Sequence, residues 1–87
     1  LDPNNGFFLD TIGWVEFKRK NYNEAVFYLE KSAAILPKSS EILDHLGDCY
    51  LMLGRKDEAI FEWKKAIKYE KDKYIISNIR AKLIKYE

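Results

Sequence analysis

The sequence has little cysteine, proline or glycine, and almost no net charge. Its single cysteine in 87 residues cannot form an internal disulfide, which excludes the disulfide-stapled class of small secreted domains. Two prolines and four glycines are too few for a linker, and 47% hydrophobic residues are typical of a globular domain. A net charge of +1 argues against a broad basic surface for nucleic acid.

Long apolar runs are also missing. No stretch approaches the roughly 20 residues that a membrane-spanning helix needs, and no signal-peptide pattern is present. The length allows one small domain. Because the chain opens with Leu1-Asp2-Pro3 and no methionine, we expect it to be part of a longer protein, and its compartment stays open.

Self-similarity at a spacing of 34 residues is the strongest pattern in the sequence. At this offset Gly13 falls on Gly47 and Ala25 on Ala59, so small residues meet small residues. The other matched pairs are mostly apolar or identical: Pro3 with Pro37, Ile12 with Leu46, Glu24 with Glu58, Val26 with Ile60, Lys31 with Lys65, and Ile35 with Tyr69. A fixed period of this size is typical of repeat proteins.

Apolar residues within each unit recur at three- and four-residue steps, which predicts helices rather than strands. Breaks fall where Gly, Pro, Asn and Ser gather, at 20–23, 37–40 and 53–55. We expect five helices and no strand: 6–20, 23–36, 40–53, 56–71 and 73–86. The expected fold class is therefore all-α, built from antiparallel helix hairpins.

Several residues are suited to cap these helices. Asn23, and either Ser39 or Ser40, can open the second and third helices by accepting a hydrogen bond from a free backbone N–H. Asp72 can open the fifth helix in the same way. Gly54 suits a left-handed cap at the end of the third helix.

The two-helix unit, its small residue at the eighth position, its alanine at the twentieth and its closing proline resemble the tetratricopeptide repeat. The matching residues are Leu9, Ile12, Gly13, Tyr22, Ala25, Leu29, Ser32 and Pro37, then Leu43, Leu46, Gly47, Tyr50, Gly54, Ala59, Trp63 and Ala66. The resemblance implies a right-handed α-solenoid and the C-terminal repeats of a larger, bacterial protein. It divides the chain into a tail of a preceding repeat (1–5), two repeats (6–39 and 40–72) and a C-terminal capping helix (73–87).

Two departures from the family pattern stand out. Glu16 replaces a large aromatic residue, and we expect its stem to pack while its carboxylate reaches toward Lys20. The last helix carries Arg80 where a buried leucine is expected, beside Ala81 at the small position. A capping helix with a solvated outer face is therefore expected there, with Ile75, Ile76, Ile79, Leu83 and Ile84 on its apolar side.

Residues that could carry chemistry are few. His45 and Cys49 are four apart on one helix, a spacing that suits two metal ligands, but no second cluster completes a site. That pair also lacks an oxyanion hole, and no glycine-rich loop could cradle a phosphate. We expect no enzyme activity, no catalytic or metal-binding residue and no cofactor.

The resemblance implies that the first helix of each repeat lines a concave groove where a protein segment binds. The groove positions are Phe7, Asp10, Trp14, Phe17, Glu41, Asp44, His45, Asp48 and Met52, together with Thr11, Lys18 and Leu51. Three aspartates would repel an anionic peptide end, so the partner is expected to be a basic or apolar peptide or helix, or one that is both.

Charge is unevenly distributed along the chain. Residues 1–63 hold seven Lys and Arg against eleven Asp and Glu, whereas residues 64–87 hold eight against three. This asymmetry supports an alternative role as a structural end-cap or a self-association unit that forms homo-oligomers through exposed solenoid ends. The basic helix lacks a clear aromatic platform, so nucleic acid is not the expected partner.

Overall fold

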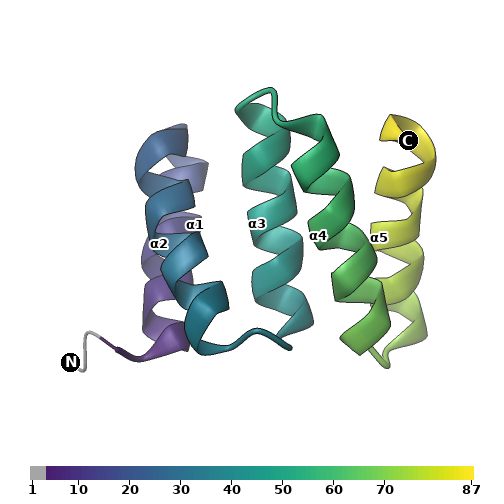
Figure 1. Ribbon diagram of the computed structural model, residues 1–87, viewed down its shortest axis with the longest axis horizontal. Coiled ribbons are helices and arrows are strands. Elements are labelled where there is room, and N and C mark those ends of the chain that lie inside the picture. The colour runs from purple at the N-terminus through teal and green to yellow at the C-terminus, as the bar shows by residue number, and fades with distance from the viewer. Residues whose placement is uncertain (1–3) are drawn as a thin grey trace.

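The computed structural model describes residues 4–87, which form five α-helices and no strand (Figure 1). The helices are α1 (Gly6–Lys18), α2 (Tyr22–Ile35), α3 (Ser40–Met52), α4 (Lys56–Tyr69) and α5 (Lys73–Tyr86). They stand side by side along the long axis, with α1 behind α2. The all-α prediction is confirmed. Residues 1–3 of the expected N-terminal tail lie outside the described residues.

Side-chain caps begin three of the helices. Asn5 Oδ1 accepts a hydrogen bond from Phe8 N at 3.1 Å, Ser39 Oγ accepts one from Ile42 N, and Asp72 Oδ1 accepts one from Tyr74 N at 2.8 Å. The expectation for Asn23 is wrong, because α2 already begins at Tyr22 and its N-cap residue makes no side-chain cap bond.

The two hairpins close with the same turn. Gly54 has φ +76° and ends α3, as predicted, while Lys20, 34 residues earlier, has φ +67°. In each turn the next backbone N–H bonds five residues back, Asn21 N to Glu16 O at 2.9 Å and Arg55 N to Tyr50 O at 2.8 Å. This 6→1 bond is the Schellman pattern. The chain therefore places a lysine in a conformation that favours glycine.

Helix packing in each hairpin depends on a glycine. A Cβ at Gly13 would lie 2.7 Å from Leu29 Cγ of α2, and one at Gly47 would lie 2.5 Å from Trp63 Nε1 of α4. Only glycine permits the close approach that buries these large side chains completely. Neighbouring hairpins meet through α2 against α3, and α4 packs on α5. The largest fully buried side chains are those of Trp63, Leu29, Ile42, Leu43, Ile79, Cys49 and Ser32.

The apolar side of α5 is only partly covered. Ile79 and Leu83 are buried, but Ile75 is 39% exposed and Ile84 is 81% exposed. Of the five residues expected on the apolar side of this helix, Ile79 and Leu83 form the buried part, whereas Ile84 is exposed. Within residues 4–87, no helix combines the length and the apolar character needed to cross a bilayer.

Candidate interaction groove

Three helices from different parts of the chain, α1, α3 and α5, share one face of the molecule. Asp10 of α1 reaches His45 of α3, with 2.8 Å between Oδ1 and Nδ1. Lys82 of α5 reaches Asp48 of α3, with 2.9 Å between Nζ and Oδ1. These contacts bring together residues far apart in sequence. We call this face the groove and define it by Lys82 and the nine predicted positions: Phe7, Asp10, Trp14, Phe17, Glu41, Asp44, His45, Asp48 and Met52.

An aromatic stack runs along the α1 side of the groove. The Trp14 ring lies 4.6 Å from that of Phe17, and 3.9 Å from the His45 imidazole, nearly parallel to both. Lys18 Nζ lies 5.0 Å from the centre of the Trp14 ring, in cation–π geometry. Stacking and the bond to Asp10 together fix the imidazole plane, so His45 is a rigid part of the groove wall.

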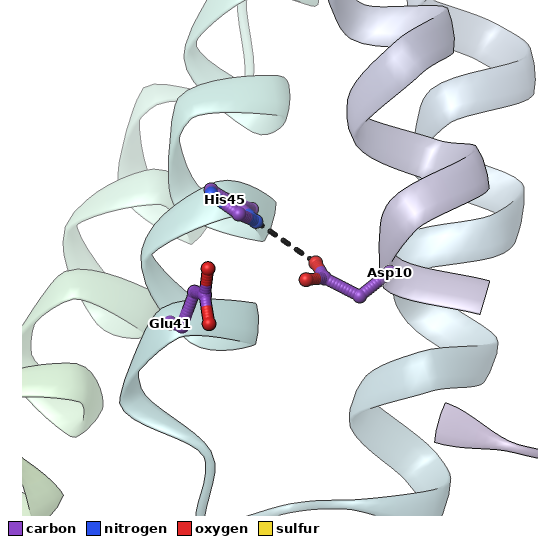
Figure 2. Close-up of side chains that lie close together, drawn as sticks. All are labelled: Asp10, Glu41 and His45. Carbon is purple, nitrogen blue, oxygen red and sulfur yellow. Dashed lines mark hydrogen bonds and ion pairs between the residues drawn. The ribbon is translucent and has the colours of Figure 1, made fainter. Parts of the chain in front are cut away.

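Asp10, Glu41 and His45 form the cluster that comes nearest to a metal site in the described residues (Figure 2). One ligand atom from each lies within 4.8 Å of the others. Figure 2 shows the Asp10 carboxylate aimed at the imidazole and bonded to it, with Glu41 beside them. Because Asp10 and His45 bond directly to each other at 2.8 Å, we interpret the pair as a structural link between α1 and α3.

The sequence spacing of His45 and Cys49 does not bring the two side chains to a common ligand site. His45 Nδ1 faces Asp10, whereas the Cys49 Sγ faces the carbonyl oxygen of Tyr22 at 3.4 Å. Burial raises the pKa of Cys49 to about 11, so its thiol keeps its proton at neutral pH. A buried, protonated thiol is a poor nucleophile and a poor metal ligand.

Lys82 neutralises two of the predicted groove carboxylates. Its Nζ donates to Asp44 Oδ1 at 2.9 Å and to both carboxylate oxygens of Asp48 at 2.9 and 3.1 Å. Burial raises the pKa of Asp48, although its bond to Lys82 acts in the opposite direction. Burial acts to lower the pKa of Lys82, but hydrogen bonds to Asp48 and Asp44 outweigh it and leave that pKa raised.

An apolar cleft of about 350 Å³ opens at the C-terminal ends of α1 and α3, beside α5. Its lining residues are Phe17, Asp48, Leu51, Met52, Trp63, Ala81, Lys82, Lys85 and Tyr86. Met52 is 50% exposed and stands at the cleft, while Trp63 is fully buried. The charged side chains Asp48, Lys82 and Lys85 give the apolar surface a polar rim, an arrangement common in binding sites.

The remaining predicted residues lie near the N-terminal ends of the same helices. Phe7, Glu41 and Asp44 line a second, more polar hollow of about 610 Å³ together with Lys38, Ser39, Ser40, Glu70 and Ile75. Phe7 is 61% exposed, and Glu41 makes no hydrogen bond or ion pair in residues 4–87. Of the nine predicted positions, three line each hollow, and Asp10, Trp14 and His45 line neither. Lys82 bonds to one aspartate of each hollow.

Sequence reasoning missed the contribution of α5 to this face. Lys82 follows Asp48 by 34 residues, and Asp48 follows Trp14 by the same step. Extending the repeat one more period would have placed Lys82 in the groove. The same extension places Lys85 and Tyr86 beside Leu51 and Met52, as the cleft lining shows.

Comparison with protein families gives one clear match. Residues 16–83 match the family model described as Tetratricopeptide repeat. The match begins near the end of α1 and ends within α5, so it covers α2, α3 and α4 in full but leaves out Phe7, Asp10 and Trp14 of the groove. A search of curated proteins gives no match.

Proposed function

Because the chain belongs to the tetratricopeptide repeat family, whose domains are protein-interaction modules, we propose that its groove is a non-catalytic binding site for a protein segment. The apolar cleft beside Met52 carries this proposal. A hollow that combines exposed apolar side chains with a charged rim is suited to hold one large apolar side chain of a peptide or helix.

The ion pairs indicate whether an apolar or a basic residue of the partner contributes more to binding. Asp44 and Asp48 are paired with Lys82, and Asp10 is bonded to His45, so three of the four groove acids already have partners. Glu41 keeps a free carboxylate in the described residues. The geometry therefore favours an apolar anchor as the main determinant of binding, with a basic residue near Glu41 as a secondary one.

Selection of short peptides against the 87-residue chain tests this proposal. We expect selected peptides to share an apolar anchor, and their binding to be lost in Met52→Glu, which puts a charge at the cleft. Phe61→Glu is the matched control, because Phe61 is 60% exposed on α4 and does not line the cleft. Equal binding by the two variants would contradict a role of the cleft.

A second candidate function is an end-cap or self-association unit of a longer solenoid. Val15 on α1 supports it: this side chain is 51% exposed, while Cys49, 34 residues on, is fully buried against α2. The α1 face thus lacks the cover that the α3 face has. Sedimentation of the chain and of Val15→Glu distinguishes this role, which predicts an oligomer that the substitution dissociates.

A further inference from the structure

The outer face of α5 is a second candidate interaction surface, next to the groove. Lys73, Ile76, Ser77, Arg80, Ala81 and Ile84 line an open hollow of about 530 Å³ there. Of these, Ile84 is 81% exposed. Exposed apolar residues beside basic ones on an ordered helix are typical of a surface that another element covers.

The chain itself shows what covers such a face. Ser77, Arg80, Ala81 and Ile84 are exposed, whereas the residues 34 positions earlier in α3 are all buried. Those equivalents are Leu43, Leu46, Gly47 and Tyr50. The following helix, α4, packs on α3 and brings Trp63 over Gly47.

The same geometry occurs in the first hairpin, where α2 brings Leu29 over Gly13. Each of the two small residues thus receives one bulky apolar side chain from an antiparallel helix. Ala81 is the third small residue of this series, and it faces an open hollow. Because alanine carries a Cβ, a helix docked here must lie somewhat farther from α5 than α4 lies from α3.

The charges on this face indicate the chemistry of the helix that would pack on it. Lys73 and Arg80 line the hollow, and no acidic side chain of the described residues does. Arg80 makes no hydrogen bond or ion pair within residues 4–87. Lys82, by contrast, is held by Asp44 and Asp48 on the groove side. A helix that packs here therefore meets two unpaired cations and gains from carrying acidic residues.

We propose that the outer face of α5 docks an acidic amphipathic helix of a partner protein, antiparallel to α5, with a bulky apolar side chain over Ala81. Arg80 and Ser77, which stand where α3 has leucines, keep this face soluble without a partner and make the docking reversible. The docking site meets the groove cleft at Ala81, which lines both hollows, and its other lining residues do not line the cleft.

A peptide with the sequence of α4, made acidic, is the probe. It comprises residues 56–69 with Lys64→Glu, Lys65→Glu and Lys68→Glu, and a lactam bridge on its outward face keeps it helical. Fluorescence anisotropy with the 87-residue chain should show saturable binding. Amide shifts in labelled protein should concentrate at Ser77, Arg80, Ala81 and Ile84, and a peptide with Trp63→Ala should bind at least about tenfold more weakly.

Variants of the protein separate docking from folding. Ile84→Glu should weaken binding by at least about tenfold, whereas Phe27→Glu should change it less than about twofold, because Phe27 lies on α2, far from α5 (Figure 1). Both side chains are exposed, at 81% and 54%, so neither change should unfold the chain. Arg80→Glu should weaken binding of the acidic peptide and strengthen binding of the peptide that keeps its lysines.

Three results would overturn the proposal. One is a lack of saturable binding, and another is a shift pattern centred on Leu51 and Met52 in the groove. The third is a dimer of the chain that Ile84→Glu dissociates, because a second copy, rather than a partner helix, would then cover this face.

Discussion

Lys82 Nζ lies 2.9 Å from Asp48 Oδ1, joining the last helix to the middle of the groove. The same ammonium group holds Asp44 at 2.9 Å. One cation thus neutralises two carboxylates that sequence reasoning had assigned to a basic partner. The contact also ties α5 to α3, two helices that share no hairpin. Its first consequence is for stability.

Removing the Lys82 charge should destabilise the fold. In Lys82→Met, Asp44 and Asp48 stay close together and partly buried without their counter-charge, which we expect to lower the free energy of unfolding by about 1–2 kcal/mol. Urea unfolding measures this, with Lys85→Met as the control, because Lys85 lines the same cleft and makes no ion pair in residues 4–87. Equal stability of the two variants would show that the ion pairs contribute nothing.

The turn at Lys20 predicts a stabilising substitution. Lys20 has φ +67°, a conformation that costs a non-glycine residue about 1 kcal/mol or more, so Lys20→Gly should raise the free energy of unfolding by about 0.5–1 kcal/mol. Gly54→Ala, at the equivalent turn, should lower it by about 1 kcal/mol, although no atom lies within 4 Å of the added Cβ. Chemical denaturation of both variants checks the paired signs. A loss of stability in Lys20→Gly would contradict the turn geometry.

At Gly47, close packing should outweigh helix propensity in its effect on stability. Alanine is the better helix former by about 1 kcal/mol, yet its Cβ would lie 2.5 Å from Trp63 Nε1, so Gly47→Ala should destabilise the fold by about 1–3 kcal/mol. Combining it with Trp63→Leu should relieve the overlap, so the double variant should lose less than the two single losses together. Thermal unfolding of the four proteins measures this coupling. Strict additivity would mean that the indole moves aside freely.

The helical repeat could be predicted from the sequence because local patterns determine it. Glycine, proline and apolar spacing placed five helices within a few residues of their observed bounds. Lys20 escaped prediction because a lysine carries no signal for positive φ; only its pairing with Gly54 at the 34-residue offset reveals it. Glu16 also behaved differently from expectation: its carboxylate lies near Arg19 and accepts a hydrogen bond from Asn21, rather than reaching toward Lys20.

The groove was harder to predict than the helices. Its positions follow from helical periodicity, but the pairing of Asp10 with His45 and of Asp48 with Lys82 depends on rotamers and on the offset between helices. The groove positions implied by the family resemblance suggested an acidic surface. The three-dimensional contacts show that most of that charge is compensated within the chain, which moves the emphasis from a basic ligand to an apolar one.

Stability should fall in alkaline solution, and Cys49 contributes to the fall. Its pKa is raised from near 9 to about 11 by burial, so the folded chain keeps a proton that the unfolded chain loses. Stability from this group is complete below pH 9 and is lost as the pH rises through 11, by about 2–3 kcal/mol in all. Tyr50 and Lys82, whose pKa values are also raised, act in the same direction.

Urea unfolding at several pH values between 8 and 11 measures this loss. Cys49→Ala should reduce the slope of stability against pH, leaving the part that comes from Tyr50 and Lys82. Because the comparison uses slopes, a constant loss from the smaller side chain does not affect it. An unchanged slope in Cys49→Ala would contradict the contribution of the buried thiol.

The most direct test of binding in the groove is to locate the apolar side chain of a selected peptide by nuclear Overhauser effects. The account predicts cross-peaks from that side chain to the methyl groups of Leu51 and Met52 and to the ring of Tyr86. Cross-peaks only to Phe27 or Phe61, which are exposed on α2 and α4, would contradict it.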